Sequence, residues 1–237
     1  MSHTPKIIHA PRLRQCIAAE WGFEPAVVDA LLAAATVRHF RRGVSIYPQG
    51  TYRNSVFVVL DGAVSISVLL PNGQRILCAF YKPGALFGFP IVEGERPRWS
   101  AADAFTAATV AAVPRREFER VLAGLPRPVV IRFFNKMLER QARFAIRLVH
   151  CAALDLRGRL ALTLVDLATT FGVAAGGGIE LRLPITHQNL AEMVGASRER
   201  ISRGMAVLRA DGLITYGRQS VTVVHLPGLQ LAATPAA

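Results

Sequence analysis

Cysteine and histidine are both scarce in this sequence, and each shortage narrows the range of functions. The three cysteines, Cys16, Cys78 and Cys151, lie far apart and without metal-site spacing. They are typical of reduced cytosolic thiols, which excludes a disulfide framework. No histidine occurs from Phe40 to Val149, so that half of the chain lacks the clustered histidines of a typical metal enzyme.

Long apolar runs and acidic residues are also in short supply. No run approaches the roughly 20 apolar residues of a membrane span, and the N-terminus lacks the pattern of a signal peptide. We therefore expect a soluble, cytoplasmic protein with no membrane partner. The 237 residues include 28 Lys and Arg against 16 Asp and Glu, a net charge of +12. This balance favours a polyanionic partner, DNA first, with an anionic membrane surface as the alternative.

The N-terminal segment shows little periodicity. Residues 1–23 carry Pro5 and Pro11, and we expect a weakly ordered extension with at most a short helix around Leu13–Glu20. A more regular helix begins at Glu24-Pro25, because proline fits the first turn of a helix.

From Val37 onward, short β-rich runs alternate with glycine-containing turns. Asn72-Gly73 between two apolar runs is a strong hairpin signal. Regularly spaced short strands predict a sandwich or barrel, here a small jelly roll within residues 24–125. The predicted strands are Ser45–Tyr47, Ser55–Leu60, Ala63–Leu70, Arg75–Tyr81, Ala101–Ala104 and Thr109–Pro114.

A long helix is predicted over Val129–Ala153, within a segment of residues 126–153. Apolar and small residues recur there at alternating steps of three and four, which predicts a two-stranded contact with a second copy of the chain. Alternatively the stripe packs on the roll, and both can hold because Phe133, Met137 and Phe144 lie on an adjacent face. The predicted dimer seam comprises Ile131, Phe134, Leu138, Gln141, Ala145, Leu148 and Ala152.

Two short helices joined by a tight turn follow at residues 186–210. Thr186 and Ser197 can cap them, because a side-chain oxygen there satisfies a free backbone N–H. Gly195 suits the turn between them. The buried seam of this predicted helix-turn-helix comprises Leu190, Val194, Ile201, Met205 and Leu208.

The elements around this motif complete a domain over residues 154–226. Asp155–Arg159 is interpreted as a hinge before a helix at Leu160–Phe171, and Ala174–Gly178 as a flexible loop. Leu213–Tyr216 and Val221–Val224 predict a hairpin, or wing, around Gly217–Ser220. Residues 227–237 are expected to form a loose tail.

The order of roll, long helix and winged helix-turn-helix defines an α+β fold that resembles the Crp–Fnr superfamily of bacterial transcription regulators. The resemblance covers about residues 24–225. Its most specific parts are Gly50, Gly62, Gly84 and Gly88 of the roll, Leu154-Asp155-x-x-Gly158-Arg159, and Ser197-Arg198-Glu199-x-x-Ser202-Arg203. It implies a homodimeric DNA-binding regulator, not an enzyme, with RNA polymerase as a further partner.

The second helix of the motif carries the candidate base-reading residues, which share one helical face. Arginine can fork onto O6 and N7 of guanine, and a carboxylate accepts from the amino group of cytosine. An ordinary surface with an ion pair between Glu199 and Arg203 is the alternative. By resemblance Arg198, Glu199 and Arg203 match the base-reading trio of the cyclic-AMP-receptor branch, whereas Glu199-x-x-Ser202-Arg203 also matches the anaerobic-regulator branch. From this hybrid we predict TGTGA-like half-sites over TTGAT-like ones. The set is Arg198, Glu199, Ser202 and Arg203.

Other residues are assigned to the DNA backbone. By resemblance Thr186, Gln188 and Arg218 occupy phosphate-contacting positions, and Arg200 is included with them. Such contacts position a protein on DNA without specifying its sequence. Two copies should bind a palindrome with half-sites about one helical turn apart.

The effector pocket departs from the cyclic-nucleotide pattern that the resemblance implies. Phe89 follows Phe87-Gly88, so the ribose-binding glutamate is missing. Arg98 matches the phosphate-binding arginine, with a plain surface arginine as the alternative, whereas Trp99 replaces the serine. The two positions that would meet adenine are Phe144 and Ala145. We therefore expect either a different effector or none, with Phe89, Trp99 and Phe144 filling the space.

No cofactor or metal is predicted. An iron–sulfur cluster in this family needs an N-terminal group of cysteines, and only Cys16 lies there. A haem-based sensor remains an alternative, although the histidine gap offers no axial ligand and Cys78 is interpreted as a buried strand residue. The same gap argues against a jelly-roll metal enzyme of the cupin type.

Overall fold

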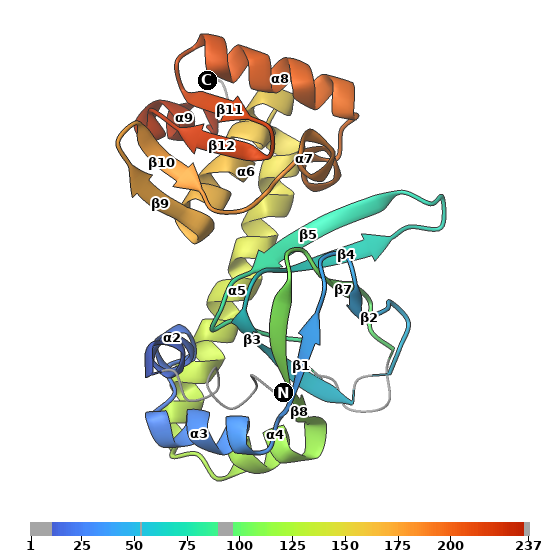
Figure 1. The fold of residues 1–237 in the computed structure, drawn as a ribbon, viewed down its shortest axis with the longest axis vertical. Coiled ribbons are helices and arrows are strands. Elements are labelled where there is room, and N and C mark those ends of the chain that lie inside the picture. Colours follow the sequence, from blue (N-terminus) through green and yellow to red (C-terminus); the bar gives the residue numbers. More distant parts are fainter. Residues whose placement is uncertain (1–10, 53, 90–96, 235–237) are drawn as a thin grey trace. The chain divides into compact units, whose positions relative to one another are not determined.

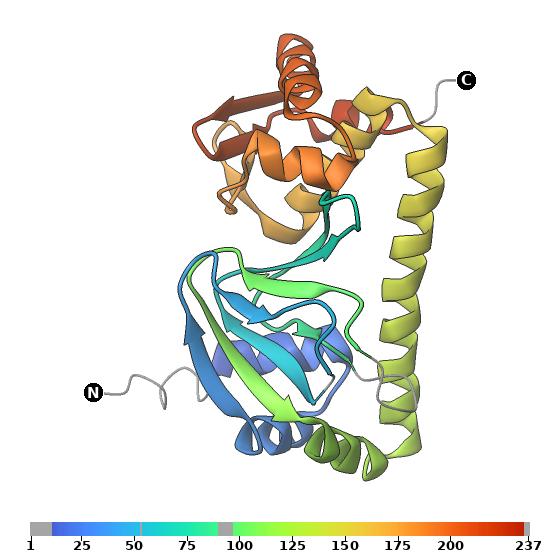
Figure 2. The same cartoon turned by 90° about the vertical axis from the view of Figure 1, so that its right-hand side faces the viewer.

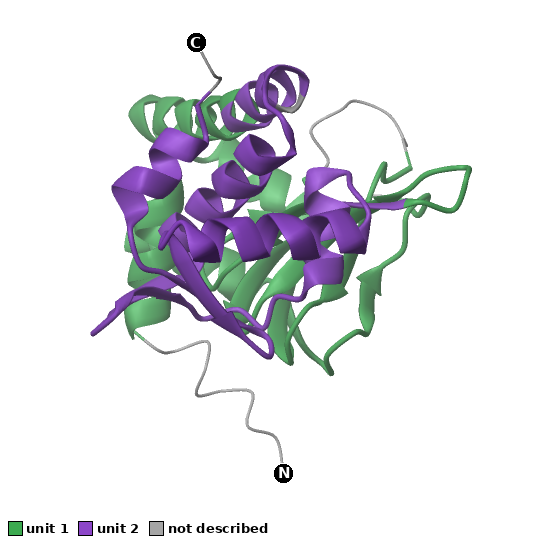
Figure 3. Cartoon of the chain, turned by 90° about the horizontal axis from the view of Figure 1, so that it is seen from above, with its two compact units in different colours: residues 1–74, 78–142 green, residues 75–77, 143–237 purple. Residues whose placement is uncertain are grey.

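The structure is a computed structural model that describes residues 11–52, 54–89 and 97–234. The ends of the predicted extension and tail, residues 1–10 and 235–237, lie outside the described residues. The chain forms two compact units, residues 1–74 with 78–142 and residues 75–77 with 143–237 (Figure 3). None of the helices in the described part is long and apolar enough to cross a membrane.

The predicted roll is built from two four-stranded sheets (Figure 1) and lies in the first unit except for residues 75–77. One sheet has the order β1 (Thr36–Phe40), β8 (Ala108–Pro114), β3 (Ser55–Asp61) and β6 (Leu86–Phe87). The other has the order β2 (Ser45–Tyr47), β7 (Ala101–Ala104), β4 (Val64–Leu69) and β5 (Arg75–Tyr81).

Strand β3 explains why this part of the sequence contains continuous apolar runs. Side chains alternate across a strand, and Val56 and Val58 belong to one buried cluster while Phe57 and Val59 belong to another. Both faces of the sheet are therefore covered by apolar side chains.

The N-terminal residues contribute to the first of these clusters. Helix α2 (Pro11–Trp21) buries Leu13, Ile17 and Trp21, which are spaced four residues apart. The indole Nε1 of Trp21 donates a hydrogen bond to the Gly84 carbonyl at 3.2 Å. The expected short helix around Leu13–Glu20 is present and somewhat longer, so the expectation of weak order is wrong for residues 11–23. Pro11 starts the helix, as proline commonly does. A single apolar stripe is enough to hold the helix in place, because that stripe packs in the same buried cluster as side chains of the sheet.

Three more helices follow or flank the roll. These are α3 (Pro25–Ala33), α4 (Arg115–Ala123) and α5 (Arg127–Ala153), the last a single uninterrupted helix (Figure 2). Phe133 and Met137 of α5 pack against the first cluster, as their place on the face beside the seam predicted. The division between the units falls inside α5, after residue 142. The helix is therefore not a domain of its own with bounds at residues 126 and 153.

The second unit is the predicted winged helix-turn-helix, and the fold class is confirmed. Its four-stranded sheet has the order β11-β12-β10-β9, with all pairings antiparallel. The elements are α6 (Leu156–Phe171), β9 (Gly172–Ala175), β10 (Gly178–Leu181), α7 (His187–Val194), α8 (Arg198–Ala210), β11 (Ile214–Gly217), β12 (Ser220–Val223) and α9 (Leu226–Ala232). Strand β9 occupies part of the segment predicted as a flexible loop.

Two further expectations about this unit are wrong. Most of the predicted hinge is the first turn of α6, because the Asp155 carboxylate accepts a hydrogen bond from the Gly158 N–H at 2.8 Å and caps the helix. The predicted loose tail forms α9 up to residue 232, with Leu229 fully buried. His225 caps this helix by accepting from the Gly228 N–H at 3.1 Å.

Candidate nucleic-acid interface

Both helices of the helix-turn-helix are capped as predicted. The Thr186 hydroxyl accepts from the Asn189 N–H at 3.2 Å, and the Asn189 side chain accepts from the Thr186 N–H at 3.0 Å. The Ser197 hydroxyl accepts from the Arg200 N–H at 3.3 Å and caps α8. Between the helices, Gly195 adopts φ 72°, a left-handed conformation that glycine takes without strain.

The predicted seam holds α7 and α8 in place. Leu190, Val194, Ile201, Met205 and Leu208 are each at most 3% exposed. Burial of this apolar surface fixes which side of α8 faces outward.

Gly204 stands where α8 meets α6. A Cβ built there would lie 2.9 Å from Cδ2 of Leu160 on α6. The absence of a side chain therefore lets α8 cross α6 closely.

The candidate base-reading residues extend from beside the buried seam of α8, at Arg198, to the opposite side of the helix, at Arg203. At about 100° per residue, the positions from Arg198 to Arg203 span roughly 140° of the helix surface. Arg198, Glu199 and Arg203 are exposed, whereas Ser202, which lies between Arg198 and Glu199 around the helix, is half-buried. We call these four residues the reading face.

Glu199 is held in its charged form. Hydrogen bonds from its own backbone N–H and then from the Ser197 side chain lower the pKa of its carboxyl group, and the charges of Arg198 and Arg203 add to this. At neutral pH this side chain is therefore only an acceptor of hydrogen bonds. It suits a base edge that presents an amino group.

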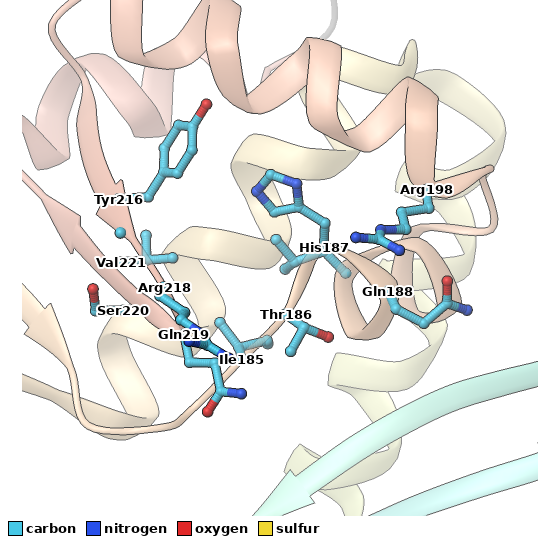
Figure 4. A pocket seen from close by; sticks show the side chains of 12 residues that line it. Ile185, Thr186, His187, Gln188, Arg198, Tyr216, Arg218, Gln219, Ser220 and Val221 are labelled. Atoms are coloured by element: carbon cyan, nitrogen blue, oxygen red, sulfur yellow. The ribbon is translucent and has the colours of Figure 1, made fainter.

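A hollow of about 390 Å³ lies between α7, the start of α8 and the wing (Figure 4). Arg198 lines it together with three of the four predicted phosphate contacts, Thr186, Gln188 and Arg218. Arg218 belongs to a tight turn, because Gly217 pairs with Ser220 across the hairpin. The fold thus collects residues that lie up to 32 positions apart in the sequence, from 186 to 218.

The fourth predicted phosphate contact, Arg200, lies elsewhere on α8. Arg200 and Arg203 line a second hollow of about 300 Å³ beside the start of α6. Arg157 of α6 lines it too and pairs with Asp211, with 2.6 Å between Nη2 and Oδ2. Asp155 lines this hollow as well, so its charged lining consists of three arginines and one aspartate.

The predicted effector-pocket residues differ in their burial and in the contacts that they make. Trp99 is 58% exposed and so does not fill an internal space. Phe89 packs with Trp21 and Phe118, in the cluster against which α2 lies. Phe144 is half-buried and Ala145 is exposed, and both belong to the second unit.

Arg98 is buried, so the alternative of a surface arginine is wrong. Its guanidinium donates to the Gly88 carbonyl at 3.1 Å and to the Ser55 carbonyl at 2.9 Å. Its central carbon lies 4.0 Å from the ring centre of Tyr47. Burial raises the pKa of Tyr47, while the charge of Arg98 opposes that shift. Arg98 is thus built into the core of the roll.

All seven residues of the predicted dimer seam lie on exposed positions of α5. The exposed fractions are 59% for Phe134, 51% for Leu138 and 73% for Leu148. A row of large apolar side chains left open to water along one helix is characteristic of a surface that a partner covers.

Two further residues of the interface, His187 and Tyr216, had no role in the sequence interpretation. His187 Nδ1 lies 2.8 Å from the hydroxyl of Ser202. The ring of Tyr216 meets the His187 ring edge-on, with 5.5 Å between centroids. A histidine directly after the Thr186 cap was a visible signal, but its partner lies 15 residues further along the chain.

Comparisons with known proteins agree with this architecture. Residues 37–124 match the cyclic nucleotide-binding domain family, and residues 158–232 match the Crp-like helix-turn-helix domain family. The nitrogen fixation regulation protein FixK of Rhizobium meliloti is 32% identical over 75% of this chain and 77% of its own length. A CRP-like cAMP-activated global transcriptional regulator of Mycobacterium tuberculosis is 26% identical over 85% of this chain and 90% of its own length. The structure of FixK2 from Bradyrhizobium japonicum shares the fold, with a TM-score of 0.74, 24% identity, and coverage of 86% of this chain and 99% of that one.

A cyclic nucleotide-binding fold joined to a winged helix-turn-helix defines a transcription regulator that binds DNA through its C-terminal domain. The chain belongs to the Crp–Fnr family of bacterial transcription regulators.

Proposed function

We propose that the protein binds palindromic DNA as a homodimer, with α8 of each copy in the major groove of a TGTGA-like half-site. The observation that carries this proposal is the exposure of Arg198, Glu199 and Arg203 on the first turns of α8, on the surface that its buried seam leaves free. Arginine and an ionised carboxylate are the groups that read guanine and cytosine edges. The preference for TGTGA-like sites comes from the match of this trio to the cyclic-AMP-receptor branch.

The exposed seam on α5 supports the dimer. Two copies joined there would present two reading faces, as a palindrome requires. Thr186, Gln188, Arg200 and Arg218 would then contact phosphates on either side of the bases. RNA polymerase is the further partner we propose, because the relatives are named as regulators of transcription.

Electrophoretic mobility shift tests the DNA proposal directly. The labelled duplexes carry a TGTGA palindrome, a TTGAT palindrome and a scrambled sequence of equal length, all at one salt concentration because phosphate contacts make affinity salt-dependent. We expect the TGTGA duplex to shift at the lowest protein concentration, as a single band. Equal affinity for all three duplexes would contradict sequence-specific reading.

We further propose that the roll does not use cyclic AMP, unlike the cAMP-activated relative. A cyclic phosphate would need the guanidinium of Arg98, but that group already donates to the carbonyls of Gly88 and Ser55. A phosphate would therefore have to compete for Arg98 with internal hydrogen-bond acceptors in a buried place, and any internal bond lost there is costly. Regulation then depends on another effector or on none.

Thermal melting checks this proposal. Cyclic AMP at millimolar concentration should leave Tm and DNA affinity unchanged, whereas a ligand present at 100 times its Kd would stabilise the fold by about 2.7 kcal/mol. Arg98→Met should lower the stability of the protein without ligand by about 1–3 kcal/mol, since two carbonyls lose their donors. A rise in Tm with cyclic AMP, together with an unchanged Tm for Arg98→Met, would show that Arg98 is a ligand-binding group.

A further inference from the structure

His187 links the first helix of the motif to the reading face. It is the first residue of α7, and its Nδ1 lies 2.8 Å from the Ser202 hydroxyl on α8. Ser202 carries the only hydroxyl group of the reading face, and it is half-buried. The orientation of that hydroxyl is therefore set from the neighbouring helix.

The surroundings of His187 keep its ring in one place and without charge. Tyr216 of β11 packs edge-on against it, and the guanidinium of Arg209 covers the Tyr216 ring at 4.8 Å from its centre. Burial and then the charge of Arg198 lower the pKa of His187, so the imidazole is neutral at pH 7. Arg218 lines the same hollow and adds another positive charge nearby (Figure 4).

A neutral imidazole has one nitrogen that donates and one that accepts. The Ser202 hydroxyl must therefore be the complement of Nδ1, donating to it or accepting from it. A free serine can both donate to and accept from a base, so it discriminates poorly between bases. If the Ser202 hydroxyl already donates to His187 it can only accept from a base. If it already accepts from His187, its own hydrogen is left to donate to a base.

We propose that His187 is a positioning residue for base recognition: its hydrogen bond orients the Ser202 hydroxyl and so sharpens the preference at one base pair of each half-site. This inference rests on the proposed function, in which α8 enters the major groove. It assigns to α7 a part in specificity in addition to its support of α8.

The test compares base preferences, measured by fluorescence anisotropy on duplexes with every substitution in one half-site. His187→Phe keeps a ring against Tyr216 but loses the hydrogen bond. We expect it to flatten the preference at one base pair by about three- to tenfold, the range that one neutral hydrogen bond supports. The other positions should keep their preferences. His187→Asn, whose amide reaches the position of Nδ1, should restore the preference.

A double-mutant comparison separates positioning from general support. In Ser202→Ala protein the preference at that base pair should already be flat, and adding His187→Phe should change it no further. An equal loss of affinity on every duplex would overturn the inference, because it would make His187 a structural or phosphate-contacting residue. Flattening that persists in the Ser202→Ala background would overturn it too. If wild-type protein shows no preference at any position, the proposed function itself fails, and that result is distinct from both.

Discussion

Replacing Arg203 by alanine should weaken binding to the cognate palindrome by about 1–3 kcal/mol per half-site. Arg203 is exposed at one end of the reading face, where its planar guanidinium can donate two hydrogen bonds to a guanine edge. The loss should be concentrated in one base pair of the half-site. The variant should accept other bases there almost as well as the native one.

Arg200→Ala is the matched control, because Arg200 lines the same hollow as Arg203 and its loss removes the same charge. As a proposed phosphate contact, Arg200 should contribute equally on every sequence. Its removal should lower the slope of log K against log salt by about 1 per protomer and leave base preferences intact. Anisotropy titrations on cognate and random duplexes at several salt concentrations distinguish the two variants. If Arg203→Ala loses as much on random DNA as on the palindrome, Arg203 contacts only phosphate.

The helix-turn-helix could be predicted from the sequence because its determinants are local. Thr186 and Ser197 cap helices within three residues of themselves, and the seam from Leu190 to Leu208 follows helical spacing. Helix α9 was missed, and α2 was predicted only as a shorter helix in a weakly ordered extension, because the stability of both comes from tertiary packing. Each is short, and α9 buries a single large side chain, Leu229. Short helices of this kind form only when another element covers them.

The role of Arg98 in the roll could not be predicted, because its contacts are not local in the sequence. Arg98 could be matched to a phosphate-binding position, but its role depends on Ser55 and Tyr47, which lie more than 40 residues away. Sequence spacing carries no information about such partners. The same holds for His187 and Ser202, which lie on different helices and meet only after folding. Matching a residue to a family position thus predicts where it lies and not what occupies its hydrogen-bonding groups.

The other large effect is expected from Leu138→Glu, in the middle of the α5 seam. Leu138 is 51% exposed in the single chain, so glutamate should disturb the protomer little. In a dimer the carboxylate would be buried without a partner, which costs several kcal/mol. We therefore expect sedimentation velocity to show monomers at concentrations where the wild-type protein is dimeric. Affinity for the full palindrome should fall by about 10²- to 10⁴-fold as the linkage between the two reading faces is lost.

Affinity for an isolated half-site provides the internal check, because a monomer with intact α8 should bind it as the wild-type protomer does. Lys136→Glu is the control: it lies two positions before Leu138, about 200° around the helix, and it removes more positive charge than Leu138→Glu. It should remain dimeric and keep most of its palindrome affinity. A Leu138→Glu protein that stays dimeric would place the dimer contact away from this seam. Monomers that still bind the palindrome tightly would mean that the two reading faces act independently, and the seam would then have no part in recognising DNA.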